Sequence, residues 1–467
     1  MMLDKRFEKL LDGFEPDFEF IPPKAIPEEE FQDRIAHIRQ KAIHGEHDVT
    51  LVNANGVLNY HTSNKYLRYL CDWNREGILI IPSDSRKGLV LFSFYTQAVI
   101  LPPSWGEAVG VEKLYQVGAL GREYSGRPAL SEEKLIEGVA KELASMGFQS
   151  ASIGLMGDGS SGKHWAALKE LLPKAKFADE THVIRHMQRL RTESEIDQIR
   201  ASAQLMDIGF QAACHACKPG VTDYELYAAF TFAQLARGGE NADGYQIGIN
   251  QWGTHIGKAY GHTIVPGDLI NFYVSGISYR GYTAQMARMI AVGDITPKQE
   301  EVLNICTESL YRAEKMIRPG VRICDINEAG FSVFIEKGYL KDNITATMPY
   351  NWAPNDDLSA LEIPLQYVPD VDLERTGRKL MHVYPPVTGP HNPNLGHGTG
   401  MHGNPHDLEV TSHNTDTCKK GMVFVLHPQW TETMVAGANI GNCYVVTENG
   451  YENLSCHTPA ETIRIKG

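Results

Sequence analysis

Short apolar runs bounded by turn residues mark the first part of the chain as strand-rich. They predict strands at 48–53, 77–82, 88–93 and 151–155. The polar turn 83–87 joins the second and third strands as a hairpin, and helical periodicity covers Glu132 to Met146. Strands that alternate with helices predict an α/β domain over residues 1–190.

The second part opens with helices whose starts share one signature, a Thr followed three residues later by Glu or Gln. This capping box occurs at Thr192 with Glu195, Thr222 with Glu225, and Thr296 with Gln299. We expect the three helices to end near Cys217, at Gly238-Gly239 and at Arg318, before Gly-rich or Pro-Gly links.

Two of these links reveal an internal repeat. Pro219-Gly220-Val221 and Pro319-Gly320-Val321 each join a long helix to another helix, and strand-rich sequence follows both. Matching flanks favour duplication over chance recurrence of a helix-stop tripeptide. The repeat predicts a pseudo-two-fold domain over residues 191–467, with a site between its halves.

Composition narrows the class of protein. A length of 467 residues favours two domains. The net charge of −13, without a Lys/Arg-rich run, argues against nucleic acid or an anionic membrane as partner. The first residues lack the apolar core of a secretory signal, and no apolar run is long enough to span a membrane. Eight scattered cysteines suit a reducing cytoplasm, and the pair Cys214 and Cys217 is interpreted as helix packing.

Histidine and glycine are concentrated at 396–407, a loop that contains His397, His402 and His406. Such a loop brings imidazoles and bare backbone close to a ligand.

Several motifs share an order and spacing along the chain: Arg191 to Glu195, the two Pro-Gly-Val links, 265–270, 281–284 with Arg288, 396–400, 420–424 and 446–450. Together they resemble the creatinase–aminopeptidase P–prolidase superfamily. The resemblance implies an α/β (α+β) protein: an N-terminal creatinase-like α/β domain, residues 1–190, followed by a pseudo-two-fold pita-bread catalytic domain, residues 191–467. It also implies a homodimer.

Metallopeptidases of this superfamily hold two divalent ions with two Asp, one His and two Glu. The resemblance places these positions on Val274 (or Tyr273 if the register slips by one), Gln285, His397, His427, and Gly441 or Asn442. Of these five ligand residues, this sequence keeps only the His, as His397. Hard cations need several anionic oxygens, so a dinuclear site is not expected and no cofactor is predicted.

Creatinase and ectoine hydrolases are relatives that work without this metal pair on small zwitterions. The substrate-side His of the superfamily matches His255. An imidazole with a pKa near 6.5 can take a proton from water and return it to a leaving nitrogen. The hypothesis is that His255 is the general acid and base, with His397 and His427 facing it, and that His402 or His406 joins them.

Candidate substrate-binding residues lie beside these motifs: Tyr282, Gln285, Arg288, His402, His406 and Trp352. Trp352 belongs to a Pro-rich insertion, 344–395, which is either an aromatic lid or a surface elaboration or dimer contact. The substrate is expected to be small and polar. A guanidinium cation like that of creatine lacks its carboxylates, because His427 and Ala287 stand where creatinase has Glu. Four acidic residues could supply another anion: Asp356, Asp357, Asp407 and Glu409.

The predicted function is metal-independent hydrolysis of an amide- or amidine-type C–N bond in a small polar or zwitterionic metabolite. Four alternatives stay open. A mononuclear Zn or Fe could bind His255, His397, His402, His406 and His427. The chain could be a lyase on a zwitterion such as dimethylsulfoniopropionate, a peptidase with an altered His-rich metal site, or a non-catalytic binding module.

Overall fold

The structure is a computed structural model that describes residues 9–54, 64–94, 108–117, 128–157, 162–241, 246–254, 257–340, 366–367, 382–383, 388–390, 394–401 and 408–467. It divides into two compact units: residues 24–189 form one, and residues 190–467 together with the segment before residue 24 form the other. The division at 189/190 lies one residue from the predicted boundary. No helix within these ranges is long and apolar enough to cross a membrane.

The unit of residues 24–189 is built on one mixed sheet with the strand order β4-β3-β2-β1-β5-β6. Its strands are β1 (Val49–Ala54), β2 (Gly77–Pro82), β3 (Leu89–Phe94), β4 (Val111–Val117), β5 (Ser152–Met156) and β6 (Lys176–Asp179). Strands β2 and β3 form the predicted antiparallel hairpin, and β1 and β5 run parallel.

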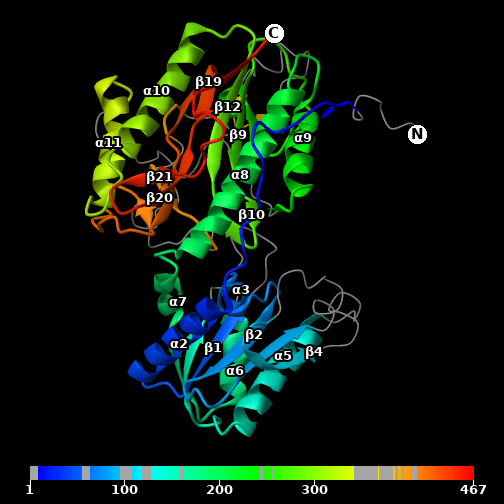
Figure 1. The fold of residues 1–467 in the computed structure, drawn as a ribbon, viewed down its shortest axis with the longest axis vertical. Helices are drawn as coiled ribbons and strands as arrows, with labels where there is room; N and C mark the ends of the chain where they lie inside the picture. Colours follow the sequence, from blue (N-terminus) through cyan, green and yellow to red (C-terminus); the bar gives the residue numbers. More distant parts are fainter. Residues whose placement is uncertain are drawn as a thin grey trace. The chain divides into compact units, whose positions relative to one another are not determined.

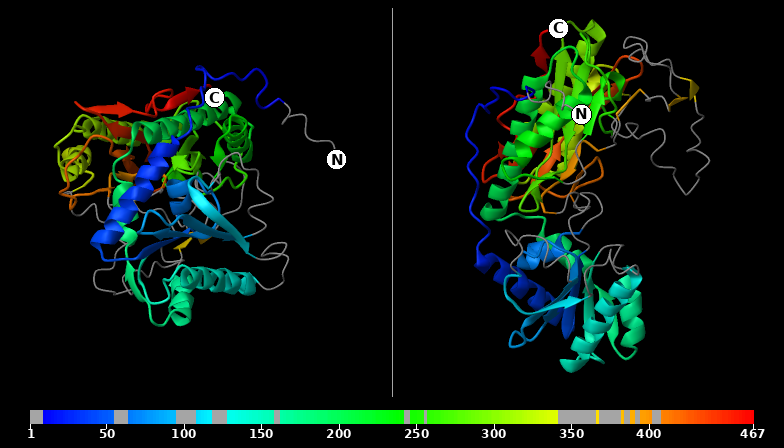
Figure 2. Two further views of the ribbon diagram at one scale, coloured as in Figure 1. Left: turned by 60° about the horizontal axis from the view of Figure 1, so that its bottom comes forward. Right: turned by 90° about the vertical axis from the view of Figure 1, so that its right-hand side faces the viewer.

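Helices cover both faces of this sheet (Figure 2). They are α2 (Glu28–His44), α3 (Tyr66–Cys71), α5 (Pro128–Ser145), α6 (Gly162–Leu171) and α7 (Thr181–Met187). Apolar residues of α5 and α6, among them Leu135, Leu143 and Leu168, bury one face of the sheet, while α2 and α3 lie against the other. Strands β1, β2 and β3 are buried on both faces, which explains their apolar runs.

Among the described residues of the other unit are the α-helices α8 (Glu193–Ala216), α9 (Asp223–Leu235), α10 (Pro297–Glu314) and α11 (Ile323–Glu336). All three predicted capping boxes are present at the starts of α8, α9 and α10. Helices α9 and α10 end about one turn earlier than predicted. The residues that follow each helix form isolated hydrogen-bonded turns and do not continue the helix.

The two Pro-Gly-Val links make the same contacts. Gly220 and Gly320 have φ of 91° and 85°, the left-handed region that favours glycine. Their backbone N–H groups donate to Ile264 and Cys418, each at 2.9 Å. Equivalent turns recur further on at Gly267 and Gly421, with φ of 93° and 84°. The repeated contacts support the duplication inferred from sequence.

The strands of this unit form several sheets between the helix pairs. The first half contributes β7 (Glu240–Asn241), β8 (Gln246–Ile249), β9 (Leu269–Val274), β10 (Ile277–Tyr279), β11 (Tyr282–Thr283) and β12 (Met286–Val292), with the 3-10 helix η2 (Asn250–Trp252). The second half contributes β13 (Gln366–Tyr367), β14 (His382–Val383), β15 (Gly396–Gly398), β16 (Glu409–Val410), β17 (Val423–Leu426), β18 (Gln429–Glu432), β19 (Ala436–Asn439), β20 (Asn442–Val446), β21 (Tyr451–Asn453) and β22 (Ile463–Ile465).

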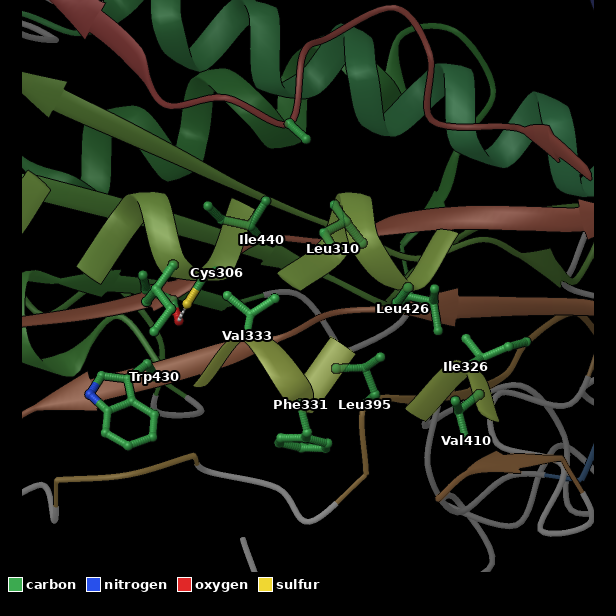
Figure 3. Packing of buried hydrophobic residues seen from close by; sticks show 14 of the residues in the cluster. Cys306, Leu310, Ile326, Phe331, Val333, Leu395, Val410, Leu426, Trp430 and Ile440 are labelled. Carbon is green, nitrogen blue, oxygen red and sulfur yellow. Dashed lines mark hydrogen bonds between the residues drawn. The ribbon is translucent and has the colours of Figure 1, made fainter. Parts of the chain in front are cut away.

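Helices α8 and α9 lie on one side of these strands, and α10 and α11 lie on the other (Figure 1). The second helix pair packs on the strands through a large apolar core, which Figure 3 shows around Leu310, Val333, Leu426 and Trp430. This core fixes which face of β17–β20 is turned toward α10 and α11. The opposite face, here called the inner face, is turned toward the first half.

The segment 9–23 was predicted to belong to the N-terminal domain, but it is grouped with the other unit. Its residues Leu11, Phe14, Phe18 and Phe20 pack against Ile208, Ala212 and Ala233 of α8 and α9. Figures 1 and 2 show this dark blue stretch running along α8. The reason is burial of aromatic surface, which outweighs nearness in sequence.

Candidate functional site

Strand alternation assigns side chains to the inner face. Leu426 and Trp430 point into the core with α10 and α11 (Figure 3). Successive side chains of a strand point to opposite faces, so His427 and Gln429 point to the inner face. The same parity applies to the paired strand, where Ile440 and Tyr444 are in the core, so Gly441 and Cys443 face inward.

His427 lies against Gly441. A Cβ atom placed on Gly441 would lie 2.7 Å from the Cβ of His427, so position 441 faces His427 directly. Asn442 instead points the other way and donates to Tyr444 Oη at 3.2 Å. The last position of the superfamily's ligand set is therefore Gly441, which has no side chain to offer.

His397 stands next to His427. Strand β15 pairs with β17, so that His397 lies opposite Val425, and the two imidazole centroids are 5.1 Å apart. His397 Nδ1 is 2.9 Å from the Gly398 carbonyl, which can only accept, so Nδ1 carries the proton and Nε2 keeps its lone pair. Burial lowers the pKa of His397. The ring is thus a neutral imidazole whose Nε2 lone pair is available to accept a proton.

Tyr273 and Gln285 come from the first half. Gln285 Nε2 donates to Tyr273 Oη at 2.6 Å, and the Tyr273 ring centroid is 5.7 Å from that of His427. Tyr273, rather than Val274, therefore occupies the position of the first Asp. Burial raises the pKa of Tyr273, which keeps the phenol protonated. The thiol of Cys443 is hydrogen-bonded to the Gln285 backbone, and burial raises its pKa to about 12.

The Gly396–Gly400 segment is held by backbone contacts from the first half. Thr399 Oγ1 donates to Thr283 O at 2.8 Å, and Arg191 Nη2 donates to Thr399 O at 3.2 Å. Gly400 has a φ of 136°, and a Cβ there would lie 2.6 Å from Arg191 Nη2. A glycine is therefore required at 400, which explains part of the glycine-rich motif.

Arg288 was expected to bind substrate, but its guanidinium is used within the protein. Its N–H groups donate to Thr458 Oγ1 and to four carbonyls: Ala287, Gly441, Ser455 and Thr458. All five donors are thus occupied. Because no donor is left for a substrate, the prediction that Arg288 binds substrate is corrected: its guanidinium holds strands of the protein together. Tyr282, the neighbouring candidate on β11, is 1% exposed.

Four sequence candidates lie outside the described residues: His255, His402, His406 and Trp352. The anion candidates Asp356, Asp357 and Asp407 and most of the 344–395 insertion also lie outside them. The residue before His255 is described: Thr254 Oγ1 hydrogen-bonds to Thr431 Oγ1 on β18. This contact brings the chain next to the inner face immediately before His255.

The side chains present do not fit the dinuclear metal that the resemblance implies. Of the five positions, Tyr273 is a protonated phenol, Gln285 is a neutral amide and Gly441 has no side chain. Only His397 and His427 are good donors, and two divalent ions need anionic oxygens. Within the described ranges, no group of three His, Cys, Asp or Glu could hold a metal ion.

Sequence reasoning missed three residues of this inner face: Cys443, Gln429 and Asn439. The signal was present, because each lies two residues from His427 or Gly441 along an alternating strand. It could be used only once the core face of β17–β20 was known.

Comparison with known proteins places this site in a family. The model of metallopeptidase family M24 matches residues 197–448, more than half of the chain. An uncharacterized peptidase of Staphylococcus aureus (strain MW2) is 26% identical over 287 residues, which cover 60% of this chain and 66% of the relative, just under two thirds of its length. An uncharacterized peptidase of Staphylococcus saprophyticus is 23% identical over 285 residues, with the same coverages.

Solved structures show the same fold over nearly the whole chain. The Xaa-Pro dipeptidase from Bacillus anthracis has a TM-score of 0.66 at 19% identity and covers 93% of this chain and 100% of its own. The X-Pro aminopeptidase from Thermotoga maritima MSB8 has a TM-score of 0.68 at 17% identity, with coverages of 92% and 99%. The chain therefore belongs to metallopeptidase family M24, a family of hydrolases, and has the pita-bread fold of the creatinase–aminopeptidase P–prolidase superfamily.

Proposed function

We propose that this protein hydrolyses an amide- or amidine-type C–N bond of a small polar or zwitterionic metabolite without the dinuclear metal of its family. The observation that carries the proposal is the pair His397 and His427, which faces Tyr273 and Gln285 where carboxylates would be needed for metal binding.

The geometry supplies the groups that such a hydrolysis needs. His397 Nε2 can take a proton from water, because its other nitrogen is fixed as a donor to Gly398 O. The water oxygen then attacks the carbon of the C–N bond. Tyr273 keeps its proton and can donate to the oxyanion or nitrogen anion that develops. The imidazolium returns its proton to the leaving nitrogen, and the bond breaks. His255 stays a predicted second acid and base.

A second candidate is an Xaa-Pro peptidase, because the proteins of similar fold include an Xaa-Pro dipeptidase and an X-Pro aminopeptidase. That activity in this chain would need a metal site rebuilt on imidazoles, with at least one of His255, His402 and His406 added to the described pair.

The test is turnover with and without metal. Untagged protein is incubated with N-carbamoyl, N-acetyl and guanidino acids and with Gly-Pro, after EDTA or after addition of Mn²⁺, and amine or ammonia release is measured. We expect turnover of a small C–N compound that EDTA leaves unchanged.

The variants His397→Ala and His255→Ala should lower kcat by about 10²–10⁴-fold, the usual contribution of general acid–base catalysis. His182→Ala is the matched control, since the His182 side chain is 76% exposed on the other unit. Hydrolysis of Gly-Pro alone, dependent on Mn²⁺ and abolished by EDTA, would show that the proposal is wrong.

A further inference from the structure

Two buried amide side chains lie side by side on the inner face. Gln429 on β18 is directly opposite Asn439 on β19 in the antiparallel register. Their exposed fractions are 4% and 3%. Paired residues of neighbouring strands have Cβ atoms about 5 Å apart and point to the same face. The two amides therefore form one polar patch, here called the amide pair.

The amide pair faces the site and not the core. Trp430 and Ala438, the neighbours of Gln429 and Asn439 in sequence, are both buried in the core with α10 and α11. Thr431, which shares the face of Gln429, contacts Thr254 just before His255. Gln429 lies two residues after His427 in sequence. The two segments stay paired between these residues, because Ile440 N–H donates to Pro428 O. Two strand residues span about 6.6 Å, a distance that a small molecule can bridge.

One polar atom of each amide of the pair has no hydrogen-bond partner within the described residues. Gln429 Nε2 and Asn439 Oδ1 are buried there without a hydrogen-bond partner, and so is Gln285 Oε1 across the site. An unsatisfied buried polar atom costs about 1–3 kcal/mol, so two such atoms on the inner face and a third across the site point to a ligand that satisfies them. A donor beside an acceptor complements a group in which a C=O and an N–H are adjacent.

The hydrogen-bonding groups beside the amide pair limit the class of ligand further. The side chains of Gln429, Asn439 and Gln285 are uncharged amides. The carboxylate of Glu409 lies on the same face, because Glu409 pairs with His397 and alternates with Val410 of the core, and it accepts from Asn394 Nδ2. A guanidinium offers only donors, so it cannot accept from the Gln429 amide N–H.

We propose that Gln429 and Asn439 form a recognition subsite that binds an uncharged ureido or carboxamide group of the substrate next to His427. The inference rests on the proposed function, since it names the substrate class of that site. The C=O of the ligand accepts from one amide of the pair and its N–H donates to the other, which sets the scissile C–N bond against the two imidazoles.

The test measures binding apart from turnover. N-carbamoylglycine and guanidinoacetate share one skeleton and differ in the ureido or guanidinium group. Their affinities are measured by isothermal titration calorimetry on the His397→Ala variant, alone and combined with Gln429→Met or Asn439→Leu. Gln234→Met is the matched control, because Gln234 is a fully buried amide of α9 in the same unit. Hydrolysis of both compounds by the unaltered protein is followed separately.

We expect N-carbamoylglycine to bind at least tenfold more tightly than guanidinoacetate, and Gln429→Met or Asn439→Leu to weaken it about tenfold, the worth of one or two neutral hydrogen bonds. Gln234→Met should leave its affinity unchanged. Binding with these properties but no hydrolysis supports the subsite and contradicts the proposed function. Hydrolysis of N-carbamoylglycine that Gln429→Met and Asn439→Leu leave unchanged refutes the subsite alone. Tighter binding of guanidinoacetate than of N-carbamoylglycine also refutes the subsite. The subsite is refuted as well if Gln429→Met and Asn439→Leu lower the stability of the protein but leave its affinity for N-carbamoylglycine unchanged.

Discussion

Replacement of Arg288 by Met tests whether this residue holds the inner face in place. Met keeps a long apolar stem but removes every hydrogen bond of the guanidinium. The carbonyls of Ala287 and Gly441 keep a donor, because the two residues also hydrogen-bond to each other through their backbones. The carbonyls of Ser455 and Thr458 each lose the Arg288 donor at 3.0 Å.

The larger effect falls on Asp207 of α8, which is fully buried. Its carboxylate accepts from Thr458 Oγ1, which also accepts from Arg288 Nε. Burial raises the pKa of Asp207, and the charge of Arg288 is the largest opposing influence. Loss of the cation leaves a buried carboxylate uncompensated, at about 3–5 kcal/mol, and two carbonyls add about 1–3 kcal/mol each when buried without a donor. These costs are not additive, so we expect Arg288→Met to lower the free energy of unfolding by at least about 4 kcal/mol.

Hydrogen–deuterium exchange with mass spectrometry measures this loss within one unit, with peptides from residues 24–189 as the internal reference. A loss of about 4 kcal/mol lowers protection of β12 and β20 about a thousandfold. Arg200→Met is the matched control, since Arg200 is a half-buried residue of α8 that pairs with Glu452 and such a pair is worth under about 1 kcal/mol. Equal protection in the two variants would falsify the role given to Arg288.

Two further predictions concern the same unit. Gly441→Ala should cost about 1–3 kcal/mol of stability and lower turnover, because the new Cβ would lie 2.7 Å from the Cβ of His427. Gly450→Ala, with nothing within 4 Å, should be neutral in urea unfolding, and equal midpoints for both would contradict the crowding at 441. Asp268 should give acid sensitivity. Burial alone would raise its pKa, but hydrogen bonds from His262, Val265 N–H and Asn250 lower the pKa below its ordinary value. Its stabilisation is then present above the unfolded-state pKa and lost as pH falls through the folded one. Asp268→Asn should therefore be less stable than the unaltered protein at pH 7, with the difference shrinking below about pH 4. A difference that is constant from pH 7 to pH 3 would rule this out.

Local signals in the sequence were sufficient to predict where the helices begin. The capping boxes of Thr192, Thr222 and Thr296 depend on residues three apart, and all are formed. The link glycines Gly220 and Gly320 were equally predictable, since a left-handed turn after a helix favours glycine. The ends of the helices were less predictable, because the last turn of a helix depends on the residues that pack beside it.

The site was only partly predictable, because its assembly depends on register between distant strands. The resemblance left the first Asp position on either Val274 or Tyr273, and the hydrogen bond between Tyr273 and Gln285 favours Tyr273. The amide pair could not be found from spacing alone, since Gln429 and Asn439 face the site only because Trp430 faces the core. Arg288 was misassigned because a motif shows that a cation is present but not which acceptors surround it.

The docking of residues 9–23 onto α8 and α9 has a consequence for synthesis on the ribosome. This segment is translated before the unit of residues 24–189, whereas the apolar surface it covers, at Ile208, Ala212 and Ala233, is made only after that unit. Domains generally fold as they emerge, the N-terminal one first, so that unit can fold while Phe14, Phe18 and Phe20 still wait for their binding surface. The docking of this aromatic segment can therefore be completed only after α8 and α9 have been synthesised.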